Sequence, residues 1–249
     1  MFAPSAGYDR AITIFSPDGR LYQVEYALET VRRGSLAVGV RTNKGVVLAV
    51  EERGRKLQNG DTSIKMFQID DHVGAVGAGY IPDARIQVDN ARVMSQSNRL
   101  IYDEPIDVES IAKRIADLNQ QYTQYAGVRP FGVSLIIAGV DDNNGPVVFL
   151  TDPTGAYQGF DAIAIGAGSD QVNEYLEKNY SKETTIDQAV TLAIECIYLV
   201  SEDKHGTAHI KTAVIDADTK KMRRLTEQEI GKNAGSAKTR SDKPPAKSG

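Results

Sequence analysis

Large apolar residues recur at a helical spacing between Arg20 and Arg33 and then give way to short strand-like runs. The steps of three, four and three between the apolar positions of this segment indicate one stripe of an amphipathic helix. Two arginines in the last turn suit the negative end of the helix dipole, and Gly34 is expected to end the helix. The apolar positions of this stripe are Leu21, Val24, Leu28 and Val31.

Strand-like runs occur in two blocks and at the end of the chain. Residues 35–80 contain four of them, SLAVGVRT, GVVLAVEER, IKMFQID and HVGAVGAGY. The first two flank Asn43-Lys44-Gly45, which predicts a hairpin with a three-residue, bulged loop. Residues 131–168 contain three further runs, FGVSLIIAGV, PVVFLT and AYQGFDAIAIGAG, and HIKTAVID and MRRLT come last.

Predicted helices arrive in pairs between these blocks. The segments are 81–100 with 106–125 and 169–180 with 185–200, and one last helical turn is expected at 227–232. A simple alternating βαβ pattern is therefore excluded. Two antiparallel sheets packed face to face, with a helix pair on each outer side, would bury the apolar face of every predicted helix and strand. The sequence thus predicts an α+β protein with a four-layer αββα sandwich.

Composition and charge narrow the class of protein. Hydrophobic residues make up 41% and charged residues 25% of the 249 residues, which is typical of a soluble globular protein. No apolar run reaches the roughly 18 residues of a membrane span. The start of the chain shows no secretory signal, and a single cysteine suits a reducing compartment, so the cytoplasm is expected.

Charge is distributed unevenly along the chain. Residues 231–249 carry +4 while the whole chain carries −4, so residues 1–230 carry −8. A body this acidic is a poor nucleic-acid binder. We expect three parts: a flexible segment at 1–12, a single domain at 13–231 and a disordered basic tail at 232–249.

The sequence does not match the common cofactor-binding and metal-binding motifs. The glycines of 74–79 and 166–168 lack the GxGxxG order of a dinucleotide site, and 141–145 lacks the alternating acids of a calcium loop. His205 and His209 do not share a helical face, and too few other ligands are present for a closed zinc site. Cys196 is interpreted as a small core residue. We therefore expect no cofactor and no metal.

Residues 8–34 carry the most specific motif. Tyr8-Asp9-Arg10 is followed by FSPDGRL at 15–21 and QVEYA at 23–27, with a turn at Ser16-Pro17-Asp18-Gly19. Helical periodicity alone would indicate only an ordinary first helix. The motif, however, resembles the N-terminal signature of α-type proteasome subunits, nearly unbroken over 20 residues. The resemblance continues through GVRPFG near position 130 to about Gly231.

This resemblance implies a fold, a set of partners and two functional elements. The fold is the αββα sandwich of the N-terminal-nucleophile hydrolases with an added N-terminal helix. The partners are other α subunits in a seven-membered ring, proteasome β subunits and unfolded proteins in transit, with no nucleic acid and no membrane. The N-terminal segments obstruct the axial pore of the ring. The implied gate residues are Tyr8, Asp9, Arg10, Pro17 and Tyr26, and the implied pore loop contains Tyr125 and Gly127, although the last two would also suit a helix C-cap.

A possible catalytic group is formed by Ser35 with Glu51 and Lys65. SLAVGV resembles the mature N-terminus of catalytic β-type subunits, where a threonine occupies the place of Ser35. In that chemistry the free α-amine of the nucleophile acts as the base. Because 34 residues precede Ser35, we interpret the group as inherited and inactive. A hydrolase that uses Ser35 after processing is the alternative.

Lys65 and Gly34 have a second interpretation. In the family, pockets between neighbouring α subunits receive the C-terminal tails of activator ATPases. A lysine there pairs with the tail carboxylate, and a glycine at the end of the first helix lets the peptide approach. By resemblance these are Lys65 and Gly34; an exposed surface lysine is the alternative for Lys65. The expected function is that of a non-catalytic α subunit of the proteasome core particle. A solitary binding module on the same sandwich is a further alternative.

Overall fold

The computed structural model describes residues 13–52, 57, 63–202 and 206–241, with only the backbone for 238–241. The predicted gate segment 1–12 therefore lies outside the described residues, as does the end of the chain at 242–249. The helices are α1 (Tyr22–Arg33), α2 (Ile81–Tyr102), α3 (Val108–Tyr122), α4 (Ser169–Asn179), α5 (Ile186–Val200) and α6 (Glu227–Ser241). The strands are β1 (Ala37–Thr42), β2 (Gly45–Glu51), β3 (Met66–Asp70), β4 (Val73–Gly79), β5 (Val133–Asp141), β6 (Gly145–Thr151), β7 (Tyr157–Gly159), β8 (Ala162–Ile165), β9 (Ile210–Asp216) and β10 (Met222–Arg224).

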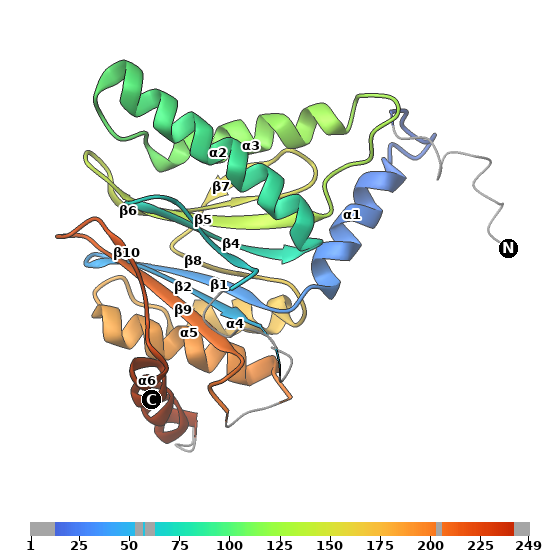
Figure 1. Ribbon diagram of the computed structural model, residues 1–249. Coiled ribbons are helices and arrows are strands. Elements are labelled where there is room, and N and C mark those ends of the chain that lie inside the picture. Colours follow the sequence, from blue (N-terminus) through green and yellow to red (C-terminus); the bar gives the residue numbers. More distant parts are fainter. Residues whose placement is uncertain (1–12, 53–56, 58–62, 203–205, 242–249) are drawn as a thin grey trace, which may run out of the picture.

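These strands form two five-stranded antiparallel sheets that pack face to face. The first sheet has the order β10-β9-β2-β1-β8 and the second the order β3-β4-β5-β6-β7. Helices α2 and α3 cover the second sheet and α4 and α5 cover the first, as Figure 1 shows. The predicted four-layer αββα sandwich is confirmed.

Three apolar layers hold the sandwich together. One lies between the sheets, where Leu48 of the first sheet and Ile136 of the second are both buried. The other two lie between each sheet and its helices, where Ile111 of α3 and Ile194 of α5 are buried. The α5 helix begins with a capping box in which Thr185 and Gln188 satisfy each other's backbone N–H groups.

Helix α1 lies at one end of the sandwich, against β4 and β5, rather than in either helix layer (Figure 1). Val24 and Val31 of the predicted stripe are buried, together with Ala27, whereas Leu21 and Leu28 are only partly buried. The helix therefore leads directly into β1, and its end lies close to the end of β4.

The first hairpin differs from the prediction. Thr42 pairs with Gly45, so the loop consists of Asn43 and Lys44 alone. The predicted three-residue, bulged loop is wrong because Gly45 is already the first residue of β2.

The run AYQGFDAIAIGAG was predicted as one strand, and this prediction is also wrong. It forms β7, which pairs with β6 in the second sheet, and β8, which pairs with β1 in the first. The chain changes sheets at Phe160 and Asp161, a step that local apolar patterning does not encode.

The predicted disordered tail is wrong for residues 232–241, which continue α6 to Ser241. The helix packs on α5 through Ile230, Ala234 and Ala237, which are buried. Small apolar residues at steps of four and three carry this contact. Their size explains why the segment lacks the large apolar residues on which the tail prediction rested.

Candidate functional site

Ser35, Glu51 and Lys65 lie together at one end of the sandwich. The antiparallel pairing of β1 with β2 places Ala37 opposite Val50, so Ser35 before β1 and Glu51 at the end of β2 are neighbours. Lys65 directly precedes β3 and reaches this point from the second sheet. The fold thus assembles the three residues that sequence reasoning grouped as a possible catalytic set.

The Lys65 ammonium contacts four oxygens of the chain. Its Nζ donates to the Ser35 carbonyl oxygen at 2.6 Å and lies 2.8 Å from Ser35 Oγ. The carbonyl oxygens of Leu36 and Glu51 both lie 3.2 Å from Nζ. Ser35 Oγ in turn donates to the carbonyl oxygen of Glu51 at 2.9 Å. Lys65 therefore ties the two sheets together at this end.

Burial determines the electrostatics of Lys65, which is only 4% exposed. Removal from water lowers the pKa of Lys65 to about 8, although nearby Glu51 and Glu52 act in the opposite direction. Neither carboxylate is among the hydrogen-bond partners of Nζ: Glu51 Oε1 accepts from Ser201 Oγ at 2.9 Å, and Glu52 accepts from Ser63 and the Ile64 N–H. The alternative of an exposed surface lysine is therefore wrong.

Gly34 lies next to this cluster and ends α1, as predicted, but not with left-handed geometry. Its φ of −67° and ψ of 147° are open to any residue. Glycine is required there because a Cβ would overlap the backbone N of Gly79. The Gly34 carbonyl also accepts from the Ala167 N–H at 2.7 Å. Gly34 thus permits the close joint between α1 and β4.

Of the predicted gate residues, Pro17 and Tyr26 are described, whereas Tyr8, Asp9 and Arg10 lie outside the described residues. Pro17 is exposed in the predicted turn, which the Gly19 N–H closes on the Ser16 carbonyl at 2.8 Å. Tyr26 is 52% exposed on α1. Both side chains are therefore accessible to a second chain.

The predicted pore-loop residues follow α3. The C-cap of α3 is Thr123, so Tyr125 and Gly127 lie beyond the cap rather than forming it. Tyr125 is 59% exposed, and Gly127 has a φ of +89°, which favours glycine. The loop therefore presents an aromatic ring to the solvent.

Sequence reasoning missed a groove beside Tyr26. It has a volume of about 330 Å³ and is lined by Tyr26 and Thr30 of α1 with Tyr80 and Arg129 opposite. The Arg129 guanidinium lies 5.3 Å from the centre of the Tyr80 ring. Asp83 holds it through two hydrogen bonds of 2.6 and 2.9 Å, which raise the pKa of Arg129. The RPFG motif at 129–132 was the available signal, because Asp83 also accepts from the Gly132 N–H.

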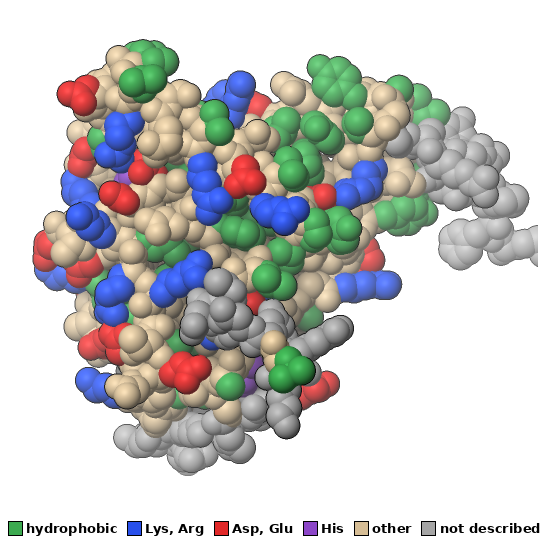
Figure 2. All heavy atoms as spheres, in the orientation of Figure 1, with side chains coloured by type: hydrophobic (Ala, Val, Ile, Leu, Met, Phe, Trp, Pro, Cys, Tyr) green, Lys and Arg blue, Asp and Glu red, His purple; other side chains and the backbone are tan. Residues whose placement is uncertain are grey.

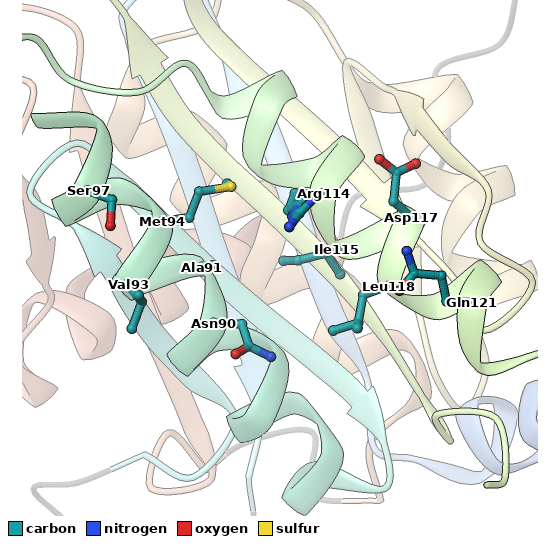
Figure 3. A pocket seen from close by; sticks show the side chains of 10 residues that line it. All are labelled: Asn90, Ala91, Val93, Met94, Ser97, Arg114, Ile115, Asp117, Leu118 and Gln121. Carbon is teal, nitrogen blue, oxygen red and sulfur yellow. The ribbon is translucent and has the colours of Figure 1, made fainter. Parts of the chain in front are cut away.

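A second missed feature is the outer face of α2. Ile86, Val93 and Leu100 are seven residues apart and exposed, and Leu100 is 87% exposed. Beside this face, a groove of about 450 Å³ runs between α2 and α3, where Met94 of α2 points toward the side of α3 that carries Arg114 and Ile115 (Figure 3). Hydrophobic side chains gather over the upper part of the molecule in Figure 2, the region of α1 and α2. Such exposed apolar surface is typical of a protein contact.

Two classes of site are not found in the part of the chain that the structure describes. No helix there has the length and apolar character to span a membrane. Nor do three side chains of the His, Cys, Asp or Glu type gather there to hold a metal ion.

A four-layer αββα sandwich with a Ser–Lys group at the start of β1 is the fold of the N-terminal-nucleophile hydrolases, here with an added N-terminal helix. Comparison with known families matches residues 31–215 to the proteasome subunit family. Residues 8–29 match the N-terminal signature of A-type proteasome subunits. The chain belongs to the proteasome subunit family and carries the α-type signature.

Curated relatives agree with this assignment over nearly the whole length. The chain is 50% identical to the proteasome alpha subunit of Methanosarcina mazei over 229 residues, which cover 92% of both chains. It is 46% identical to the protein of the same name from Archaeoglobus fulgidus over 231 residues, covering 92% of this chain and 93% of the relative. The relative from Methanothermobacter thermautotrophicus is 50% identical, with 91% of each chain covered.

Proposed function

We propose that this chain is a non-catalytic α subunit of the proteasome core particle in the cytoplasm. It forms the outer seven-membered ring, templates the β rings that hold the proteolytic sites, docks an activator ATPase and gates the entry of unfolded proteins. The observation that carries this proposal is the α-type signature at residues 8–29.

The exposed surfaces support assembly with other subunits. The apolar face of α2 is open to solvent, with Val93 67% and Ile101 68% exposed. Covering this face with another subunit of the core particle would remove it from water. The exposed ring of Tyr26 and the groove beside it are a second contact surface, at the end of the molecule where α1 packs.

The gate is assigned to residues 1–12 together with Pro17 and Tyr26. The exposure of Pro17 and Tyr26 supports this, because an inter-subunit cluster with Tyr8, Asp9 and Arg10 needs partners that the same chain does not already cover. The pore loop at Tyr125 and Gly127 would contact the substrate chain in transit.

Deletion of residues 1–12 tests the gate. In the core particle assembled with a β subunit, we expect the deletion to speed hydrolysis of a small fluorogenic peptide whose entry the intact N-terminal segments obstruct. The matched control is deletion of residues 242–249, at the other end of the chain, which should leave the rate unchanged. An equal rate for the intact particle and the 1–12 deletion would remove the gate from the proposed function.

Activator docking is assigned to Lys65 and Gly34. The position of the Lys65 cation supports this role, because its hydrogen bond to the Ser35 carbonyl oxygen places it next to Gly34 at the end of α1, where a carboxylate would be attracted to it. We expect Lys65→Ala to weaken activator binding about fivefold to tenfold, equivalent to about 1 kcal/mol. Lys44→Ala, which changes an exposed lysine in the β1–β2 turn, is the matched control. Equal activator affinity in an assembled Lys65→Ala particle would refute the assignment.

A further inference from the structure

Sequence reasoning set Ser35 aside as a nucleophile because the α-amine that would activate it is bonded to Gly34. No histidine lies near Ser35 in the sequence to act as a replacement base. The structure supplies a different candidate. The Nζ of Lys65 lies 2.8 Å from Ser35 Oγ, although 30 residues separate the two in the chain.

The surroundings of Lys65 favour its neutral form more than those of a surface lysine. The side chain is buried, and no described carboxylate is a hydrogen-bond or ion-pair partner of its Nζ. Burial lowers the pKa of Lys65 to about 8, so a substantial fraction of the amine is neutral at mildly alkaline pH. A neutral amine has a lone pair that can accept the proton of a serine hydroxyl, as in known Ser–Lys nucleophiles.

We propose that Ser35 and Lys65 form a serine–lysine pair that makes Ser35 a modification site for small acylating or phosphorylating electrophiles. This site needs neither processing of the chain nor a free N-terminus. It shares Lys65 with the proposed docking site but requires neither ring assembly nor gating, so a failure to label Ser35 would leave those two parts of the proposed function standing.

Reaction with a dialkyl fluorophosphate would start from the charged resting arrangement, in which Nζ donates to Ser35 Oγ and Oγ donates to the Glu51 carbonyl oxygen. Once Nζ has lost a proton, the hydroxyl turns to donate to it. Oγ then forms a bond to phosphorus as its proton passes to Nζ, the P–F bond breaks, and fluoride leaves with the bonding electrons.

The expected product is a stable adduct and not a turnover cycle. Ser35 is half-buried, whereas Lys65 beside it is almost completely buried, so Ser35 is the member of the pair that a reagent from solvent would meet. Once Oγ carries the phosphoryl group, it is no longer a nucleophile, so labelling of this residue stops after one equivalent. The geometry therefore supports stoichiometric labelling of one residue.

Labelling of the full-length chain with diisopropyl fluorophosphate, followed by intact mass and peptide mapping, tests this inference. We expect one adduct on Ser35, with a labelling rate about tenfold higher at pH 9 than at pH 7 and little further increase above pH 9. Ser63 is the internal comparison: its hydroxyl donates to the Glu52 carboxylate, so it should stay unlabelled.

Two variants separate the base from a merely structural lysine. Ser35→Ala should abolish the adduct. Lys65→Arg keeps the positive charge and the donors but cannot lose a proton, so it should lower the rate at pH 9 at least tenfold and flatten the pH profile. Absence of a Ser35 adduct at pH 9 in the folded wild-type protein would overturn the proposal. So would a rate that does not change with pH, which can be measured even if Lys65→Arg does not fold.

Discussion

At the scale of single residues, Lys65 is the side chain whose surroundings matter most. Three carbonyl oxygens and one hydroxyl contact its Nζ, and the side chain is almost completely removed from water. In the unfolded chain the same amine is hydrated and has an ordinary pKa of 10.5. This difference makes the stability of the fold depend on pH.

The sign of that dependence follows from the lowered pKa. Below about pH 8 both the folded and the unfolded chain carry the proton, so the cost of burying the charge is fully present. Between about pH 8 and 10.5 the folded chain has released a proton that the unfolded chain still holds, so stability rises with pH. The contribution of Lys65 across this window is about 3 kcal/mol.

We therefore predict a pH slope in the free energy of unfolding that Lys65→Met removes. The free energy of unfolding, measured with denaturant at several pH values from 7 to 10, should rise more steeply in the wild-type chain than in the variant. The quantity to compare is the difference in unfolding free energy between the wild-type chain and the variant at each pH. Burial raises the pKa of the Cys196 thiol, which lowers stability above about pH 9 in both proteins and cancels in this difference. Parallel pH profiles would show that Lys65 is not desolvated in the folded chain.

The sequence supported three interpretations of Lys65, and only tertiary structure separates them. Its neighbours Ser35 and Glu51 are 30 and 14 residues away, so no local pattern indicates that the three meet. The pairing register of β1 with β2 and the packing of the two sheets bring them together. The gate residues depended instead on the family resemblance, which reached Tyr8, Asp9 and Arg10 without any structural observation.

At the scale of elements, Gly34 shows how one residue sets the position of a helix. Its α-carbon faces the backbone of Gly79, at the end of β4, with no room for a side chain. The neighbouring Gly79 is also constrained, with a φ of +113°. The lack of a side chain at both glycines thus allows α1 to meet the second sheet.

We predict that Gly34→Ala destabilises the chain by about 3 kcal/mol, because the added Cβ would overlap backbone atoms that cannot move separately. Thermal unfolding at equal protein concentration measures this. Gly231→Ala is the matched control: it lies in α6, nothing lies within 4 Å of its added Cβ, and it should be neutral or stabilising by up to about 1 kcal/mol. Similar melting temperatures for wild type and Gly34→Ala would contradict the close joint.

Most elements were predictable because their periodicity matches their burial. The stripe of α1, the two long helices over the second sheet and the Thr185 cap of α5 all follow from local spacing and capping chemistry. Two of the failures have a common physical cause. The change of sheet at Phe160 and the packing of α6 on α5 depend on distant partners, and small residues such as Ala234 give no apolar signal of their own.

At the scale of the whole molecule, the sandwich leaves two surfaces for other subunits. The apolar face of α2 lies on the outside of one helix layer, and the groove beside Tyr26 lies at the end where α1 packs (Figure 1). Because these surfaces are on different elements, one chain can contact more than one neighbour at the same time. This arrangement suits a ring that also contacts another ring.

Native mass spectrometry of the full-length chain, alone and co-produced with a proteasome β subunit, tests ring formation most directly. We predict a species at seven times the 27.1 kDa of one chain, or multiples of it, and a larger species that contains both subunits in equal number. A chain that stays monomeric at micromolar concentration and does not associate with the β subunit would contradict its assignment as a ring-forming α subunit.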